Sequence, residues 1–214
     1  AEKTAILWDK TGKKIRSFEG HSIAVTAVDF APTEGGDKVL TCNANGRAYL
    51  WDIANNTVVP NFAAKAGDVW SLEFSPDGQA VLTGSGKLLD LQGNLIRSFD
   101  ASGPTAFSAD GKLVLTGTGK GVKIWDGNTG KLLRDLKTQG DDFFDKLAVA
   151  AFSPDGKQIL TGGIGVQLWS WANPQAPLHV LSEGRGGFVG PRPITSLAFS
   201  PDGKSALAPG GEAI

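Results

Sequence analysis

The stretch SLEFSPDGQAVLT, residues 71–83, decides the fold of this chain. Two short apolar runs flank a turn that contains Pro-Asp-Gly, and apolar residues alternate along the first run. This pattern is typical of two antiparallel strands joined by a tight turn. The stretch recurs as AVDFAPTEGGDKVLT (27–41), TAFSADGKLVLT (105–116), AAFSPDGKQILT (150–161) and SLAFSPDGKSAL (196–207). The sequence therefore predicts a repeated β-hairpin.

A second repeated stretch lies between the copies of the first. It starts with an apolar run that ends in Trp-Asp or a substitute, passes through a polar turn and closes on another apolar run. Its copies are AILWDKTGKKIRSF (5–18), AYLWDIANNTVVPNF (48–62), KLLDLQGNLIRSF (87–99), VKIWDGNTGKLLRDL (122–136) and VQLWSWANPQAPLHVL (166–181). Each unit is expected to form four short antiparallel strands. Such a sheet buries both faces only by stacking on neighbours like itself, and radial stacking into a β-propeller satisfies every copy.

The whole chain, 1–214, is therefore predicted to be one all-β propeller domain of about five blade equivalents. Full blades are expected at 23–66, 67–101, 102–146 and 147–193. Residues 1–22 supply the third and fourth strands of a split blade, and residues 194–214 supply its first and second strands. A composite blade made from these halves would close a five-bladed ring and remove two open sheet edges. The alternative is an arc of a larger ring.

Composition and charge narrow the class of protein. The 29 glycines suit many short strands joined by tight turns. No apolar run approaches the ~20 residues needed to cross a bilayer, so no membrane partner is expected. The net charge is −1, and Lys and Arg are spread along the chain, so no nucleic-acid partner is expected either. The single cysteine, Cys42, excludes an internal disulfide and leaves the cellular compartment open.

Taken together, the two stretches resemble the WD-repeat family along essentially the whole chain. The residues that carry the resemblance are the Trp-Asp pairs at 8–9, 51–52 and 125–126, the Gly-His pair at 20–21 and the Phe-Ser-Pro-Asp-Gly turns at 74–78, 152–156 and 199–203. Their periodic recurrence in phase makes the resemblance specific. The Asp-Gly pairs of these turns are assigned to the positive backbone angles of a tight hairpin, not to acid-base chemistry.

The resemblance implies a hydrogen-bonded set that ties a blade together. In the family this set is a His before the first strand, a Ser or Thr in the second, an Asp in the next turn and the Trp of the third. Carried over by position, the set is His21, Thr41, Asn45 and Trp51. Asn45 stands where the family prefers Asp, and its neutral amide is expected to give a weaker link than a carboxylate.

The three blades that follow depart from this pattern. Leu89 stands where the Trp belongs, and the turns after Gly84, Gly117 and Gly162 are shorter than those of the family. These blades are expected to rely on packing alone.

Catalytic chemistry is not indicated by the sequence. Nucleophilic catalysis needs a base near a nucleophile, and the chain has two histidines, of which His21 is assigned to the structural set and His179 to an outer strand. The carboxylates Asp141, Asp142 and Asp145 lack the glycine-pivoted spacing of a calcium loop. No catalytic residue, metal, cofactor or small-molecule substrate is therefore expected.

The remaining candidate site is a surface. The resemblance implies that the loops before the first strand and between the second and third strands lie on one face, which we call the top face. Two such loops, 137–146 and 182–193, are unusually long, and Trp70 stands where the other copies have small residues. The candidate partner-binding residues are Trp70, Phe143, Phe144, Arg185, Phe188 and Arg192. Trp171 is expected on the opposite face.

These observations predict a non-catalytic interaction scaffold that binds a protein or peptide through the top face. An alternative is a sensory or structural domain of a larger multidomain protein. A propeller enzyme is the least favoured hypothesis, because the positions that should face inward are Val, Leu, Ala and Ser rather than ionisable residues.

Overall fold

The computed structural model describes residues 2–32, 36–55, 57–59, 71–118, 121–137, 147–163, 165–173, 176–182, 194 and 196–208. The chain divides into two compact units, Ala1–Ser98 and Phe99–Ile214. All regular elements in the described ranges are β-strands, which confirms the predicted all-β class. Within the described part of the chain, no helix has the length and hydrophobicity to span a membrane.

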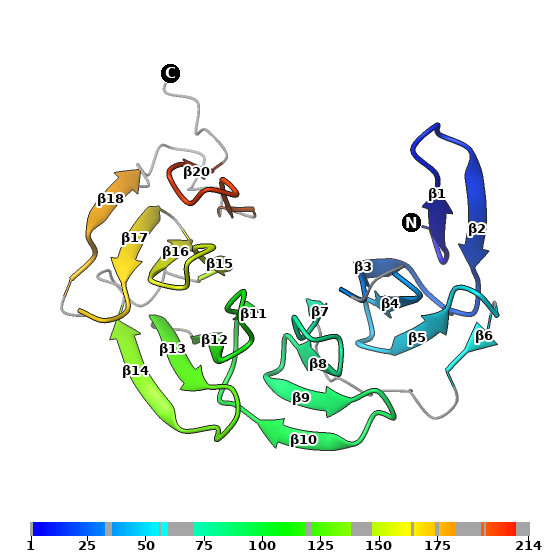
Figure 1. Cartoon of the computed structure of the whole chain (residues 1–214), viewed down its shortest axis with the longest axis horizontal. Helices are drawn as coiled ribbons and strands as arrows, with labels where there is room; N and C mark the ends of the chain where they lie inside the picture. The colour runs from blue at the N-terminus through cyan, green and yellow to red at the C-terminus, as the bar shows by residue number, and fades with distance from the viewer. Residues whose placement is uncertain are drawn as a thin grey trace. The chain divides into compact units, whose positions relative to one another are not determined.

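The first unit contains a two-stranded sheet and two four-stranded sheets, all antiparallel and in chain order (Figure 1). The two-stranded sheet pairs β1 (Ala5–Trp8) with β2 (Lys14–Phe18). The next consists of β3 (Val25–Phe30), β4 (Lys38–Asn43), β5 (Ala48–Asp52) and β6 (Thr57–Val58). The third consists of β7 (Leu72–Phe74), β8 (Ala80–Thr83), β9 (Lys87–Asp90) and β10 (Leu95–Ser98).

The second unit repeats this plan. Its first sheet consists of β11 (Thr105–Phe107), β12 (Leu113–Thr118), β13 (Gly121–Asp126) and β14 (Leu132–Lys137). Its second consists of β15 (Val149–Phe152), β16 (Gln158–Gly162), β17 (Val166–Ser170) and β18 (His179–Ser182). A final pair joins β19 (Ala198–Phe199) to β20 (Ala206–Leu207). Consecutive four-stranded antiparallel sheets of this kind are the blades of a β-propeller, which is the predicted fold class.

The hairpin between the first two strands of a blade is fixed by a serine and an aspartate. Ser75 Oγ donates to Asp77 Oδ1 at 2.6 Å and accepts the Ala80 N–H at 2.9 Å. Gly78 follows with φ +69°, a left-handed conformation that suits glycine. The same bonds recur at Ser108–Asp110, Ser153–Asp155 and Ser200–Asp202. The glycine therefore supplies the positive φ, and the aspartate carboxylate accepts the hydrogen bond of the serine hydroxyl.

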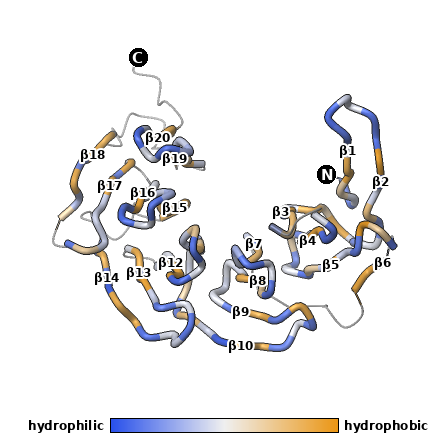
Figure 2. Tube along the Cα trace, in the orientation of Figure 1, coloured by the Kyte–Doolittle hydropathy of each residue, from blue (hydrophilic) through white to orange (hydrophobic). Residues whose placement is uncertain are grey.

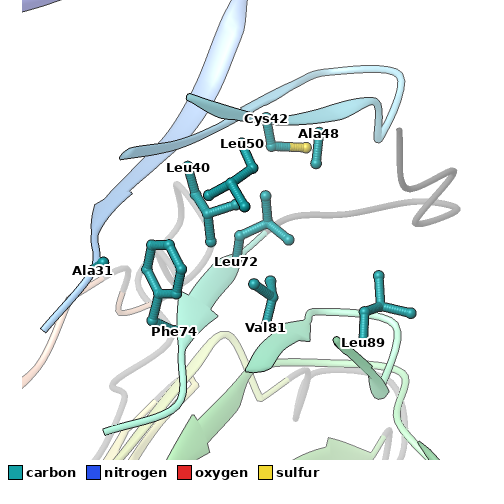
Figure 3. Close-up of a cluster of buried hydrophobic side chains, with 9 residues drawn as sticks. All are labelled: Ala31, Leu40, Cys42, Ala48, Leu50, Leu72, Phe74, Val81 and Leu89. Carbon is teal, nitrogen blue, oxygen red and sulfur yellow. The ribbon is translucent and has the colours of Figure 1, made fainter. Parts of the chain in front are cut away.

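The core of the first unit lies between its two complete sheets. Leu40 and Leu50 of one sheet face Leu72, Phe74 and Val81 of the next, and all five are buried (Figure 3). Burial of side chains of this size stabilises a fold by about 1.5–3 kcal/mol each. The repeated apolar stretches therefore serve mainly to pack one blade on another.

The core of the second unit has the same construction. Leu115, Ile124 and Leu136 of the β11–β14 sheet cluster with Ile159 and Trp169 of the β15–β18 sheet. All five side chains are almost completely buried.

The two-stranded sheet covers part of the β3–β6 sheet. Ala5 and Leu7 of β1 pack on a cluster formed by Phe18, Val39 and Trp51. Figure 2 shows hydrophobic residues along β1 and β2 and a hydrophilic connection between them. The pair β1–β2 therefore packs against its neighbour as the outer half of a blade.

A carboxylate links two blades of the first unit. Asp29, on β3, accepts the Phe74 N–H of β7 at 2.8 Å and the Phe30 N–H at 2.9 Å. Burial raises the pKa of the Asp29 carboxyl, and these two backbone donors oppose that rise. The bonds give the half-buried carboxylate two N–H donors that replace water.

Candidate functional site

One end of the β3–β6 sheet is formed by the β4–β5 turn and the chain that leads into β3. The Ala44 N–H donates to the Ala24 carbonyl at 3.1 Å, which holds these two segments together. This end corresponds to the top face of the sequence prediction, because it carries the connection between the second and third strands. His21, Asn45 and Arg47 lie here.

A buried polar chain lies beneath this end. His21 Nε2 lies 2.7 Å from Thr41 Oγ1, and Trp51 Nε1 donates to the same hydroxyl at 2.8 Å. His21 and Trp51 are each 5% exposed, and Thr41 is fully buried. The structure therefore brings together three of the four residues in the predicted set.

The fourth residue of the predicted set, Asn45, does not join this chain. Its side chain is exposed, and its backbone N–H donates to Asn43 Oδ1 at 3.1 Å. The buried Asn43 also accepts the Arg47 N–H at 3.0 Å, so Asn43 is the amide that closes the turn. His21 Nδ1 is buried without a hydrogen-bond partner. The placement of Asn45 in the set is therefore corrected, because the apex of the turn directs its side chain to solvent.

Two residues that the sequence prediction did not single out complete this end. The Arg47 guanidinium lies 5.2 Å from the centroid of the Tyr49 ring, and that ring meets His21 edge-on at 4.7 Å. Burial lowers the pKa of the His21 imidazole, and the charge of Arg47 lowers it further. His21 is therefore neutral at neutral pH, and Arg47 is an exposed charged group at this end. The available signal was Tyr49, which stands where the other full repeats have Lys87, Lys123 and Gln167.

The expectation that the later blades rely on packing alone is wrong for two of them. Trp125 Nε1 donates to Thr116 Oγ1 at 2.9 Å, and Trp169 Nε1 donates to Thr161 Oγ1 at 3.0 Å. These bonds reproduce the Trp–Thr link of the first full blade. They form because the strand register, rather than the length of the preceding turn, sets the distance between the second and third strands.

Leu89 breaks this link in the β7–β10 sheet. There the Thr83 hydroxyl accepts the Lys87 N–H at 3.1 Å and lies 3.0 Å from Ser85 Oγ. The threonine of this sheet therefore bonds within its own turn.

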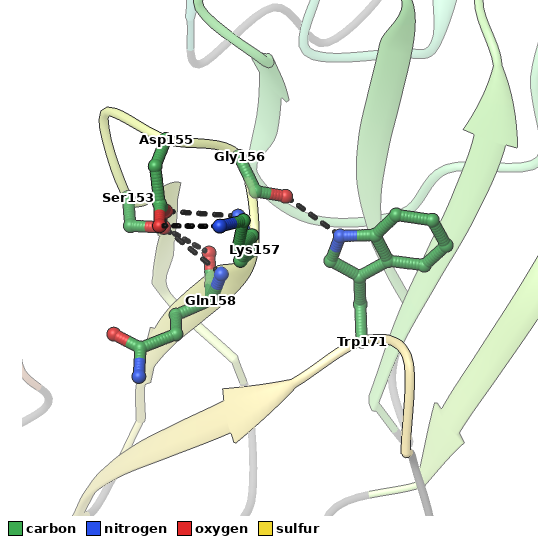
Figure 4. Close-up of polar contacts among 6 residues, drawn as sticks. All are labelled: Ser153, Asp155, Gly156, Lys157, Gln158 and Trp171. Atoms are coloured by element: carbon green, nitrogen blue, oxygen red, sulfur yellow. Dashed lines mark hydrogen bonds and ion pairs between the residues drawn. The ribbon is translucent and has the colours of Figure 1, made fainter.

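All six predicted partner-binding residues lie outside the described residues: Trp70, Phe143, Phe144, Arg185, Phe188 and Arg192. Trp171 is described, and its Nε1 donates to the Gly156 carbonyl at 2.6 Å (Figure 4). The Arg134 guanidinium lies 5.9 Å from the Trp171 ring centroid. Trp171 thus packs at the hairpin-turn end of its sheet, opposite to the β16–β17 connection.

The described residues contain no group of three or more His, Cys, Asp or Glu side chains that could hold a metal ion. His179 is exposed on β18. The acidic residues Asp141, Asp142 and Asp145 lie outside the described ranges. Burial raises the pKa of the Cys42 thiol to about 11, so this side chain is protonated at neutral pH.

Comparison with known proteins identifies the class to which these blades belong. The family described as WD domain, G-beta repeat matches residues 12–52, 57–89 and 92–126, which is about half of the chain. The repeated sheets and the Trp–Thr bonds already define a repeat protein of the propeller class. The chain belongs to the WD40 family.

Several curated relatives carry the same repeat. The chain is 31% identical over 138 residues to nuclear distribution protein PAC1 of Arthroderma benhamiae, which covers 63% of this chain and 24% of that protein. It is 26% identical over 89 residues to the guanine nucleotide-binding protein subunit beta of Saccharomyces cerevisiae. This match covers 39% of this chain and 21% of that protein. WD repeat-containing protein SL1-17 of Schistosoma mansoni is 29% identical over 83 residues. This match covers 37% of this chain and 27% of that protein. The chain thus spans about a quarter of the length of these relatives.

The match to the WD40 family suggests a protein-interaction scaffold. The family assignment therefore places the chain in a class whose usual partners are proteins.

Proposed function

We propose that the chain is a non-catalytic scaffold that binds a protein or peptide through its top face. The family assignment supports the class of function. The observation that carries the proposal is the β4–β5 end of the β3–β6 sheet. There the exposed Arg47 lies over the Tyr49 ring, above the buried hydrogen-bonded chain of His21, Thr41 and Trp51.

This arrangement suits binding for a physical reason. A contact group that is already held in place loses little conformational entropy when a partner docks. Arg47 can donate to carboxylates or carbonyls of a partner, and arginine and tryptophan are enriched among residues that dominate binding energy. Trp70 is proposed as the main apolar anchor, with Phe143, Phe144 and Phe188 around it and Arg185 and Arg192 at the rim.

The test uses the whole chain as bait, followed by mass spectrometry and affinity measurements on the captured partner. Trp70→Ala is expected to weaken binding by about 2 kcal/mol or more, which is about 30-fold in Kd. Arg47→Glu is expected to weaken it as well. The matched control is Lys13→Glu, an equal charge reversal at an exposed residue in the β1–β2 connection, which by repeat position lies at the opposite end of a blade.

The reverse ranking would overturn the proposal. If Lys13→Glu weakened binding while Trp70→Ala and Arg47→Glu did not, and all variants stayed folded, the partner would bind the opposite face. If none of the three changed the affinity, the partner would bind elsewhere on the chain and the proposal would also fail.

A further inference from the structure

Arg47 is held in place by its own sheet, but its charge is not neutralised there. The Arg47 N–H donates to Asn43 Oδ1 at 3.0 Å, and the Arg47 carbonyl accepts the Asn43 N–H at 3.1 Å. The guanidinium lies 5.2 Å from the centroid of the Tyr49 ring. No ion pair among the described residues includes Arg47. The β4–β5 end of the sheet therefore presents a positioned, exposed cation to solvent.

A blade of the second unit shows how a cation near the same end of a sheet is neutralised within the chain. Lys123 on β13 forms an ion pair with Asp100 and lies 5.9 Å from the Trp125 ring centroid. Glu19 holds the repeat position of Asp100, because each follows the sequence Ile-Arg-Ser-Phe or its first-repeat copy. Glu19 is exposed, and it forms no ion pair with a described residue. The β3–β6 sheet thus keeps an unneutralised cation where the β11–β14 sheet has an ion pair.

The buried His21 imidazole registers the charge of Arg47. Burial is the largest cause that lowers the pKa of His21, and the charge of Arg47 is the second. Residues 2–3 also lie at this end, because the Val25 N–H donates to the Glu2 carbonyl at 3.0 Å. The other charged residues of these segments are exposed and form no ion pair with a described residue: Glu2, Lys3 and Glu19. The charge that acts on His21 is therefore positive and comes from Arg47.

A partner that docks over this end removes water from the Arg47 guanidinium. Burial of a charged group is strongly unfavourable unless an opposite charge and hydrogen bonds replace the lost water. A backbone carbonyl of the partner would supply a hydrogen bond without the opposite charge. A carboxylate supplies both, and it can accept two parallel N–H bonds from the planar guanidinium.

We propose that the peptide segment bound at the β4–β5 end is acidic and that one of its Asp or Glu carboxylates pairs with Arg47, which rests on the top-face binding proposed above. The incoming carboxylate takes the place that an internal carboxylate holds beside Lys123 in the other blade. It also offsets the charge that acts on His21. Charge complementarity at this end therefore selects acidic segments over neutral or basic ones.

Selection from a random linear peptide library displayed on phage, with the full chain immobilised, gives the first test. Peptides enriched on the wild-type chain are expected to carry Asp or Glu, and a parallel selection on Arg47→Gln is expected to lose that preference. Arg47 is exposed and its backbone bonds do not depend on its side chain, so this variant should keep the fold. The matched control is Lys13→Gln, which removes the same charge from the exposed β1–β2 connection and is expected to select as the wild type does.

A double-mutant cycle then tests the contact itself. One enriched peptide is compared with its amide analogue, in which the carboxylate is replaced by a carboxamide. The amide analogue and Arg47→Gln are each expected to raise Kd by about tenfold, and the two changes together by no more than either alone. Arg47→Lys is expected to give an intermediate Kd, because it keeps the charge but loses the fork of parallel N–H donors.

The His21 imidazole supplies a readout that affinity does not. Both peptides cover the same surface, so the difference between them isolates the effect of the carboxylate charge. NMR titration is expected to give His21 a higher pKa in the complex with the acidic peptide than in the complex with the amide analogue. An equal pKa in the two complexes would place the carboxylate away from Arg47 and overturn the inference.

The outcomes separate this inference from the proposed function. Equal affinity of the wild-type chain for the two peptides, together with weaker binding by Trp70→Ala, would overturn the acidic contact and leave the proposed function standing. If no peptide is enriched, the proposed function fails and the acidic contact fails with it. The same holds if the enriched peptides bind equally well to the wild type, Trp70→Ala and Arg47→Gln.

Discussion

Replacing Thr41 with valine removes a hydroxyl that two buried side chains share. Trp51 Nε1 and His21 Nε2 lie 2.8 Å and 2.7 Å from this oxygen. Valine has nearly the same shape as threonine, so the substitution leaves no cavity. Each buried polar group that loses its partner costs about 1–3 kcal/mol. The expected loss in the free energy of unfolding is therefore about 2–6 kcal/mol, because two buried groups lose their partner.

Urea unfolding at neutral pH, followed by tryptophan fluorescence, measures this loss as a shift in midpoint at constant m value. Thr161→Val is the graded comparison, because the main partner of that hydroxyl is Trp169 Nε1 at 3.0 Å. It is expected to cost about half as much. Thr57→Val is the control, since Thr57 is exposed on β6. If Thr41→Val lowered the free energy of unfolding no more than Thr57→Val, the Thr41 hydroxyl would not link His21 to Trp51. That result would refute the polar chain beneath the top face.

Three further predictions concern the same contacts. His21→Ala is expected to lower stability by about 1–3 kcal/mol. The pKa of His21 in the folded state is lowered from 6.5, so its stabilising contribution is present above pH 6.5 and is lost as the pH falls through the folded pKa. The difference in the free energy of unfolding between wild type and variant should therefore narrow in urea titrations at lower pH. Ser153→Ala is expected to move the Asp155 pKa upward toward 3.8, since the Ser153 hydroxyl is the largest cause of its lowering, and carboxyl NMR titration reads this directly. Trp171→Phe removes the donor to the Gly156 carbonyl and should cost about 1 kcal/mol in thermal or urea unfolding; no change would mean that the ring alone holds the turn.

The hairpin repeat could be predicted from the sequence because its signals are local. Alternating apolar residues and the Pro-Asp-Gly turn specify two strands and their connection, and burial of Leu40, Leu115 and Leu160 follows from the same periodicity. The Trp125–Thr116 bond was missed because it depends on strand register across a short turn, which the turn length does not reveal.

The candidate site could be predicted less completely, for similar reasons. Position in the repeat placed Asn45 in the polar set, but which amide enters the turn is decided by backbone geometry, and Asn43 accepts both N–H groups. Arg47 carries no motif of its own, and its role depends on the Tyr49 ring beneath it.

Amide hydrogen exchange with and without a saturating protein partner tests the central claim most directly, because it locates the binding face without any substitution. Binding through the top face predicts slower exchange in residues 19–24 and 43–47, together with unchanged exchange in the hairpin turn 153–157. Protection confined to the hairpin turns 75–79 and 153–157, with no change at 43–47, would contradict it.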